Sequence, residues 1–330
     1  MFFQEQSLAN RRQLLRLAAA AGALTLPLAG RTQSTWPTKP VNLIVPFPAG
    51  GGTDAFARPL SAQFAKQTGK TMVIDNRGGA GGTLGAGIAA KAAPDGYTLF
   101  MGAVHHAIAP SMYPKLDYDI EKDFVPLVLM ANVPQVLVVN PKSVSGDFKA
   151  FVAQLKASPG RLNYGSAGTG TSHHLAGELF KQQTGTFITH IPYTGAGPAV
   201  VALLGGQIDA VSTGPATVLQ HVKAGKVRIL GHWGSGSLAA LPDVPALKDA
   251  GFNAEYAQWS GLFIPAATPE PVAQRLRAAA RTAAQDPKVR EVIQGSGSPV
   301  LYLDTPEFEK YVKADVRRLV DVVKRIGKVE

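Results

Sequence analysis

Short apolar runs alternate with longer segments of helical period from Val41 onward. Three such runs predict buried strands, at residues 41–45, 71–74 and 97–101. Between them, apolar residues recur every four positions, as at Phe56, Leu60 and Phe64 and again at Leu84 and Ile88. That spacing places side chains on one face of a helix. The order strand, helix, strand, helix, strand predicts a parallel sheet covered by helices.

A second set of the same kind follows further along the chain. Its predicted strands are residues 161–164, 187–191, 208–212 and 227–230. The pairs Leu175/Leu179 and Ala176/Phe180 mark an intervening helix. Two sets of this kind predict two α/β lobes.

Two extended segments connect these lobes. Residues 124–140 form an apolar stretch, interrupted by Pro126 and Pro134, that is long enough to leave one lobe and enter the next. Residues 256–265 are the natural return strand. The pattern therefore predicts two α/β lobes joined by a two-strand hinge. We expect lobe 1 to comprise residues 36–137 and 262–330, and lobe 2 residues 138–261.

The C-terminal segment carries two helix-start patterns. Residues 268–270 and 305–307 both read Thr-Pro-Glu. Thr is a common N-cap, Pro is favoured at the first helical position, and an acid in the first turn complements the helix dipole. We therefore expect Thr268 and Thr305 each to cap a helix that packs back on lobe 1.

The N-terminus resembles an export signal. Arg11, Arg12 and Arg16 precede the uncharged residues 17–29, and Ala29-Gly30 offers small residues for cleavage. We predict a signal peptide over residues 1–35, whose removal leaves a soluble protein in the periplasm. The twin-arginine and general secretory routes both remain open.

Composition narrows the functional classes. Of 330 residues, 45% are apolar and 17% charged, which is typical of a globular protein. The absence of cysteine excludes disulfides, thiolate metal sites and a lipid-modified cysteine anchor. The net charge of +10 favours anionic ligands. The basic residues are nevertheless dispersed and form no stripe interleaved with aromatics, so we expect no nucleic-acid partner.

Two glycine-rich loops carry the candidate chemistry. Residues 46–54 join the first predicted strand of lobe 1 to its helix, and residues 164–172 do the same in lobe 2. Glycines allow close approach to a ligand, and the free N–H groups at a helix start attract anions. Either loop alone is equally consistent with a tight turn. A loop of this kind at the carboxyl end of the first strand in each lobe favours a ligand cleft.

An enzyme is the alternative interpretation. Gly50, Gly52 and Ala55 fit the dinucleotide-binding spacing, and Asp75 ends the second strand where a ribose-binding acid would stand, as in an NAD-dependent oxidoreductase. No Lys follows the glycines as a phosphate loop requires, and Ser166 lacks the glycine of a nucleophile elbow. We therefore expect a binding protein that has no cofactor and no catalytic residue.

Two adjacent histidine pairs, His105-His106 and His173-His174, lie beside the predicted cleft. Adjacent side chains point to different sides of a helix or strand, so neither pair chelates a metal ion. We predict no metal site. Two interpretations remain open for these histidines, namely donation of hydrogen bonds to a carboxylate and simple packing.

Several strings in a fixed order resemble one known family. They are residues 46–54 (PFPAGGGTD), 76–82 (NRGGAGG), 94–99 (PDGYTL), 164–170 (YGSAGTG), 190–198 (HIPYTGAGP) and 204–209 (LGGQID). The chain is similar to the Bug family, the extracytoplasmic receptors of tripartite tricarboxylate transporters. The resemblance implies a type II periplasmic binding protein fold. Its lobes would close on a small organic carboxylate, a dicarboxylate or an aromatic acid, for delivery to the membrane subunits of the transporter.

By this resemblance the two loops, with neighbouring residues, hold the ligand. The expected ligand-binding residues are Phe47, Ala49, Gly50, Gly51, Gly52, Thr53, Asp54, His105, His106, Ser166, Ala167, Gly168, Thr169, Gly170, Thr171, Ser172, Thr194 and Gly195. A closed form that signals to a membrane sensor is compatible with the same interpretation. The chain departs from the family where Val104-His105-His106 replaces small hydroxyl residues and where Thr194 replaces a frequent Lys.

Overall fold

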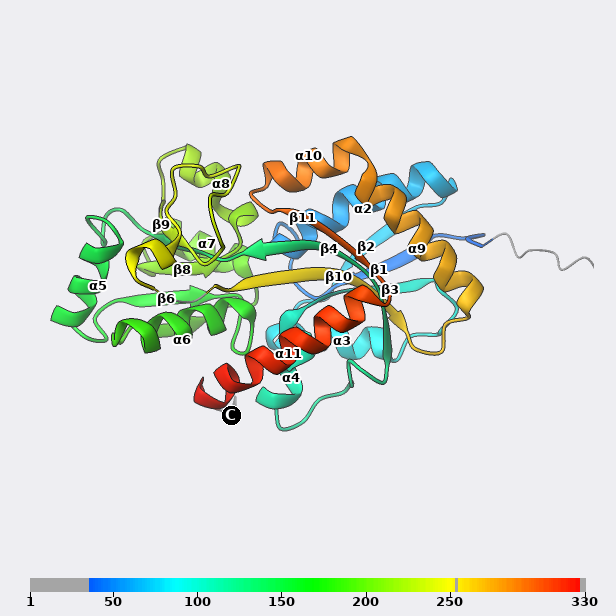
Figure 1. Cartoon of the computed structure of the whole chain (residues 1–330), viewed down its shortest axis with the longest axis horizontal. Helices are drawn as coiled ribbons and strands as arrows, with labels where there is room; N and C mark the ends of the chain where they lie inside the picture. The colour runs from blue at the N-terminus through cyan, green and yellow to red at the C-terminus, as the bar shows by residue number, and fades with distance from the viewer. Residues whose placement is uncertain (1–35, 253–254, 327–330) are drawn as a thin grey trace, which may run out of the picture. The chain divides into compact units, whose positions relative to one another are not determined.

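The computed structural model describes residues 36–252 and 255–326. The predicted signal peptide, residues 1–35, and the choice of export route lie outside these residues. Two mixed sheets, each covered by helices, organise the part of the chain from Lys39 onward. Figure 1 shows the two sheets and the strands that pass between them.

The first sheet has six strands in the order β11-β4-β10-β3-β1-β2. β1 pairs in parallel with β2 and β3, whereas β10 is antiparallel to β3 and β4. The strands are β1 (Val41–Val45), β2 (Met72–Asn76), β3 (Thr98–Ala103), β4 (Phe124–Pro134), β10 (Ala257–Pro265) and β11 (Val300–Asp304). The helices of this lobe are α2 (Gly52–Thr68), α3 (Thr83–Ala90), α4 (Val104–Met112), α9 (Glu270–Gln285), α10 (Pro287–Gly295) and α11 (Glu307–Ile326). The predicted parallel arrangement of the first three strands is confirmed.

The second sheet has five strands in the order β7-β6-β8-β5-β9. β6 is parallel to β7 and β8, while β5 runs antiparallel to β8 and β9. The strands are β5 (Val136–Val139), β6 (Asn163–Ser166), β7 (Thr189–Pro192), β8 (Ala210–Thr213) and β9 (Arg228–His232). The helices are α5 (Phe148–Ala157), α6 (Ser172–Thr184), α7 (Ala196–Leu204) and α8 (Pro215–Lys223). The four predicted strands of this lobe are present, each beginning one or two residues later than the sequence indicated.

β4 and β10 connect the two lobes. They pair side by side from Phe124 opposite Pro265 to Pro134 opposite Ala257 (Figure 1). The chain enters the second sheet one residue after β4, where Gln135 separates it from β5. The structure thus has two α/β lobes joined by two strands, and the predicted fold class is confirmed. The lobe boundaries at residues 137/138 and 261/262 stay a prediction.

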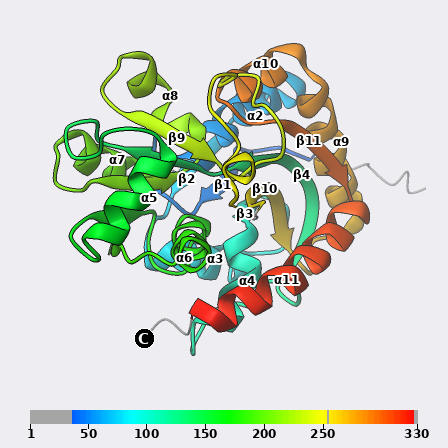
Figure 2. The ribbon, with the colours of Figure 1, turned by 60° about the vertical axis from the view of Figure 1, so that its left-hand side comes forward.

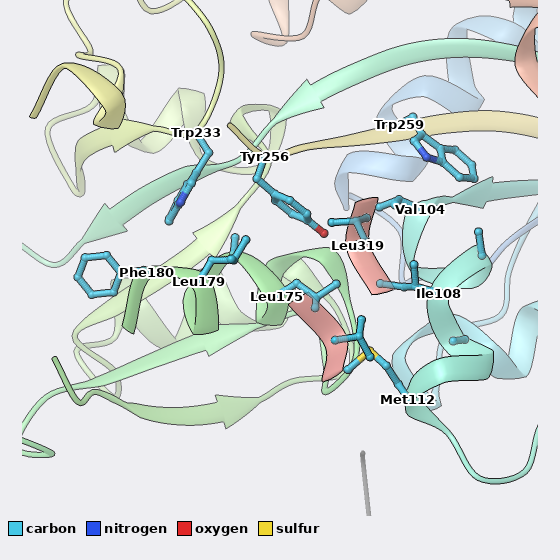
Figure 3. Close-up of a cluster of buried hydrophobic side chains, with 14 of the residues drawn as sticks. Val104, Ile108, Met112, Leu175, Leu179, Phe180, Trp233, Tyr256, Trp259 and Leu319 are labelled. Carbon is cyan, nitrogen blue, oxygen red and sulfur yellow. The ribbon is translucent and has the colours of Figure 1, made fainter. Parts of the chain in front are cut away.

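One apolar cluster crosses from one lobe to the other. α11 packs against α4 of the first lobe and α6 of the second, and α4 lies beside α11 in the turned view of Figure 2. Met112, Leu175 and Leu319, one from each of these helices, are buried in this cluster (Figure 3). Burial of apolar surface stabilises a protein by about 25 cal/mol per Å². This cluster therefore stabilises the contact between the two lobes where α4, α6 and α11 meet.

The helix predicted from Leu84 and Ile88 is confirmed, but these two residues do not lie on its buried face. Leu84 and Ile88 do lie on a helix, α3, but their side chains are 51% and 40% exposed. The buried positions of α3 are the small residues Gly85, Ala86, Gly87 and Ala89. Gly85 sits so close to Pro46 that a Cβ atom would lie 2.9 Å from its Cα atom. Close packing of α3 on the sheet therefore selects the small face over the apolar one.

The predicted threonine caps are wrong. α9 begins at Glu270 with Pro269 as its N-cap, and the Thr268 hydroxyl donates to the carbonyl of Pro265. The Thr305 hydroxyl donates to the carbonyls of Pro126 and Leu127 in β4. The Thr268 hydroxyl therefore closes a local turn, whereas the Thr305 hydroxyl ties the segment before α11 to β4. Within residues 36–252 and 255–326, no helix is long and apolar enough to cross a membrane.

The aromatic packing of α11 on the hinge strand gives a stability prediction. Phe308 is fully buried and its ring contacts Trp259 and Phe263 at centroid distances of 5.5 and 5.3 Å. Phe308→Ala should lower the free energy of unfolding by about 3–5 kcal/mol in urea denaturation, because it leaves a cavity. Phe187→Ala, at a 53% exposed phenylalanine, is the control and should cost much less. Equal losses in both variants would contradict this account of the core.

Candidate functional site

Both glycine-rich loops end at the start of a helix. The first leads from β1 to α2, whose N-cap is Gly51. The second leads from β6 to α6, whose N-cap is Thr171. Thr171 stabilises its helix start because its side-chain oxygen accepts a hydrogen bond from the N–H of His174 at 3.4 Å. The predicted position of each loop, at the carboxyl end of its strand, is confirmed.

The two loops meet at one small cavity between the sheets. It has a volume of about 20 Å³, roughly the space of a water molecule. Its lining residues are Phe47, Gly51, Gly52, Thr53, Phe56, His105, Val133, Gln135, Ala167, Thr171, Ser172, His173, Ala196, Gly214 and Gln258. We call this space the interlobe cavity. Small-molecule pockets measure about 300–1,000 Å³, so the interlobe cavity as it stands is too small for such a ligand.

Several helices present their first turns to the interlobe cavity. Gly52 begins α2, Ser172 begins α6 and Ala196 begins α7, while Gly214 is the N-cap of α8. The first N–H groups of a helix have no intrahelical acceptor, and a helix start carries about half a positive charge. Among the described residues that line the cavity there is no Asp, Glu, Lys or Arg. The positive potential at this point therefore comes from backbone dipoles.

Polar side chains also line the interlobe cavity. The Ser172 hydroxyl donates to Oε1 of Gln258 on β10, which ties the second loop to the hinge. Oε1 of the fully buried Gln135 accepts no hydrogen bond, and neither ring nitrogen of His105 has a partner. Nδ1 of His173 is likewise unpaired. Because an unpaired buried polar atom costs about 1–3 kcal/mol, these groups favour a polar ligand.

Burial keeps the histidines of this region neutral. Desolvation lowers the pKa of His106 and that of His173 to about 4 each. The pKa of His105 is lowered well below its usual value, first by burial and then by the neighbouring His106 and His173. A neutral imidazole carries one N–H donor and one acceptor nitrogen. The cavity is therefore uncharged in the folded protein at neutral pH.

The expected ligand-binding residues divide into three groups in the structure. Those that line the interlobe cavity are Phe47, Gly51, Gly52, Thr53, His105, Ala167, Thr171 and Ser172. Ala49 and Gly50 instead border a separate hollow of about 560 Å³ beside α7. The remaining ones, which border neither space, are Asp54, His106, Ser166, Gly168, Thr169, Gly170, Thr194 and Gly195.

Asp54 stabilises the first glycine-rich loop through hydrogen bonds. Its buried carboxylate accepts hydrogen bonds from the N–H of Gly50 at 2.9 Å, from Arg58 at 2.7 Å and from Asn76 at 3.3 Å. These partners fix the turn that precedes α2. Ser166 has the corresponding role in the second glycine-rich loop. Its hydroxyl lies 2.7 Å from Nε2 of His190 and accepts a hydrogen bond from the N–H of Gly168 at 3.1 Å.

Glycines bring the two lobes into close contact around the cavity. A Cβ atom on Gly195 of the second lobe would lie 2.7 Å from Cδ of Pro48 in the first. A Cβ atom on Gly81 would lie 2.6 Å from the carbonyl oxygen of Thr169, and Gly81 has a φ of +63°. Tyr113 at the end of α4 donates to the same carbonyl at 2.6 Å. Any side chain at these glycines would hold the lobes apart.

Sequence reasoning missed part of the cavity lining, including every residue from the segments that connect the lobes. The lining residues outside the expected ligand-binding set are Phe56, Val133, Gln135, His173, Ala196, Gly214 and Gln258, of which only His173 was placed beside the cleft. Gln135 and Gln258 interrupt apolar stretches that the sequence marks as crossover strands. A polar side chain in a buried strand is uncommon, so these glutamines carried a usable signal. Ala196 and Gly214 are helix starts of the same type as the two loops that were recognised.

The surroundings of Asp75 do not support the alternative of an NAD-dependent oxidoreductase, in which Asp75 would bind the ribose. Asp75 at the end of β2 pairs with Arg77 at 2.8 Å, and it does not border the interlobe cavity.

The described residues also bear on the prediction of no metal site. Nε2 of His174 lies 3.7 Å from Oε1 of Glu178. The described residues contain no group of three or more His, Cys, Asp or Glu side chains that could hold a metal ion.

Comparison with known proteins points to one family. The model of the tripartite tricarboxylate transporter family receptor matches residues 56–328. Protein BugT of Bordetella pertussis is 34% identical over 296 residues, covering 89% of this chain and 91% of that protein. Among solved structures, a periplasmic transporter is 42% identical with a TM-score of 0.85, covering 88% of this chain and 97% of that one.

Two further structures carry ligands. An R. palustris protein solved with adipate is 30% identical, with a TM-score of 0.85, and covers 88% of this chain and 97% of that one. MatC from Rhodopseudomonas palustris, solved with bound malate, is 33% identical, with a TM-score of 0.82, and covers 87% of this chain and all of that one (100%).

The buried histidines predict a pH-dependent stability. The unfolded chain binds protons on histidine near pH 6.5, whereas folded His106 and His173 stay neutral down to about pH 4. The unfolded state therefore binds more protons in this window. The free energy of unfolding should fall by about 1.4 kcal/mol per pH unit for each such histidine as the pH drops. Urea denaturation between pH 7 and pH 5 measures this slope, His173→Gln should reduce it, and a flat profile would refute it.

Proposed function

The chain belongs to the tripartite tricarboxylate transporter receptor family, and we propose that it captures a small organic carboxylate in the periplasm for delivery to the membrane subunits of such a transporter. The family consists of binding proteins, so the chain is not an enzyme and the oxidoreductase alternative is set aside. Two of its relatives are a periplasmic transporter and the periplasmic binding protein BugD, and two others were solved with adipate and malate. A dicarboxylate of that size or an aromatic acid is the proposed ligand.

One observation carries this proposal. The starts of α2, α6, α7 and α8, from both lobes, converge on a closed cavity that no charged side chain among the described residues lines. Carboxylate oxygens accept hydrogen bonds from such N–H groups, and the helix dipoles favour their negative charge. An amine or other cation would be repelled by the same dipoles. The apolar side chains of Phe47, Phe56 and Val133 would contact the carbon skeleton of the ligand.

Capture would involve a hinge motion of the two lobes, residues 36–137 with 262–330 and residues 138–261. The ligand would first meet the loop around Gly51 and Gly52 and then draw in the second loop around Thr171 and Ser172. Closure would bend β4–β5 and β10, the strands that connect the lobes. The closed form would be the one that the membrane subunits, or a membrane sensor, recognise.

Isothermal titration calorimetry tests the proposal directly. The chain should bind at least one member of a panel of adipate, malate and benzoate, and it should not bind the diamine putrescine at the same concentrations. The ligand should also raise the melting temperature, because a ligand that binds only the folded state stabilises it. If no carboxylate in the panel produces heat or a thermal shift, while the protein is folded by circular dichroism, the proposed function fails.

Gly52→Val should weaken carboxylate binding about tenfold or more without loss of the fold. A Cβ atom at Gly52 would meet no atom within 4 Å, so the side chain fits the protein but enters the space next to the cavity. Ligand crowding of 1–3 kcal/mol corresponds to about 5- to 150-fold in affinity. Gly295→Val, at the end of α10 and equally uncrowded, is the matched control. Equal affinities in both variants would remove the first loop from the site.

Gly195→Ala should weaken binding by obstructing closure, although Gly195 does not line the cavity. The added methyl group would meet Cδ of Pro48 across the lobe contact at 2.7 Å. Gly197→Ala, two residues further along α7 with open space around it, is the control. Small-angle X-ray scattering with saturating ligand should show a larger radius of gyration for Gly195→Ala than for the control. An identical contraction in both would show that this contact does not limit closure.

A further inference from the structure

His105 occupies the interlobe cavity without any hydrogen-bond partner. It follows β3 directly, in the first turn of α4, and its side chain is 3% exposed. The edge of its ring meets Phe47 at a centroid distance of 5.3 Å, and His106 lies behind it at 4.1 Å. These contacts hold the ring in place but satisfy neither ring nitrogen. His106 is different, because its Nδ1 accepts from the N–H of Ala103 at 3.0 Å.

His173 approaches the same space from the other lobe. It is the second residue of α6, its side chain is 9% exposed, and its Nδ1 has no hydrogen-bond partner. His173 and His105 line the same cavity, and after burial and His106 the electrostatic effect of His173 also lowers the pKa of His105. The pair therefore exists only when α4 of one lobe and α6 of the other come together.

The groups around this pair contain no counter-charge. The first loop and α2 contribute Thr53, the crossover strands contribute Gln135 and Gln258, and α6 contributes Thr171 and Ser172. α7 contributes Ala196, and the start of α8 contributes Gly214, which has no side chain. Of the described residues that line the cavity, His105 and His173 alone carry a side chain that can take up a proton, and burial keeps both neutral without a ligand. His106 lies behind His105.

A dicarboxylate brings two negative charges into this space. Helix starts supply partial positive charges, but a closed cavity disfavours a net negative charge strongly. A carboxylate beside an imidazole favours the protonated ring, so it reverses the effect of burial on the histidine. Binding of the dianion should thus move a proton from solvent onto an imidazole nitrogen, with no other bond made or broken.

We propose that His105 and His173 form the subsite for one carboxylate of a dicarboxylate ligand, and that the ligand is bound together with a proton carried by this pair. The inference rests on the proposed function and specifies its ligand: the glycine-rich helix starts hold the other carboxylate. The histidine pair then selects a dicarboxylate over a monocarboxylate of the same length.

Calorimetry with adipate and malate in phosphate and in Tris at pH 7 tests this proposal. These buffers release protons with different heats, so proton uptake makes the observed binding enthalpy differ between them. We expect uptake approaching one proton per ligand, and affinity that falls by up to about tenfold per pH unit above neutrality. Hexanoate, which lacks the second carboxylate, should show no uptake. Identical enthalpies for a bound dicarboxylate in the two buffers would overturn the proposal and leave the proposed function intact.

His105→Gln and His173→Gln should each weaken dicarboxylate binding about tenfold and reduce the proton uptake, while hexanoate binding changes little. His221→Gln, on α8 outside the interlobe cavity, is the control and should keep the wild-type uptake. Nitrogen-15 NMR of the wild-type imidazoles gives a readout that needs no variant, since adipate or malate should shift one ring from neutral to protonated. Full uptake in both histidine variants would overturn the proposal. If neither adipate nor malate binds but another carboxylate does, this proposal fails and the proposed function stands.

Discussion

The attraction between helix-start N–H groups and negative oxygen atoms is the interaction on which the proposed site depends. A carboxylate that leaves water must recover its hydrogen bonds and have its charge balanced. A buried lysine or arginine would need the same compensation when no ligand is bound. Backbone N–H groups at the starts of α2 and α6 need less, because the helices already fix their orientation and partial charge.

This interaction constrains the topology of both lobes. The helix starts reach a common point only because β1 and β6, which precede α2 and α6, end at the same gap. The end of β4 and the residue after it form one wall of the gap with alternating side chains, since Val133 and Gln135 line the interlobe cavity. Asn132 and Pro134 border a hollow of about 470 Å³ on the opposite face of the strand. The segments that join the lobes therefore also line the interlobe cavity.

Glycine has two roles in this arrangement. Gly51 and Gly52 leave the start of α2 accessible. The glycine-rich sequence of this loop already indicated such access. Gly81 and Gly195 act elsewhere, where the lobes touch and where a Cβ atom would collide with Thr169 or Pro48. The second role gives the close fit that leaves a cavity of only about 20 Å³. It also explains why histidines meeting across this gap are so completely desolvated.

The sequence by itself determined the two sets of strands and helices, the crossover segments and the position of both glycine-rich loops. These features follow from local periodicity and turn chemistry, which act over a few neighbouring residues. Local pattern predicted the helix α3, but packing decided its buried face, since Leu84 and Ile88 are exposed. Local pattern failed at Thr268, whose hydroxyl binds the nearby carbonyl of Pro265, and at Thr305, whose hydroxyl binds a carbonyl of the distant strand β4. Only the tertiary structure brought His105, His173 and Gln135 to one cavity with Ser172 and Gln258, because these residues come from segments that lie far apart in the chain.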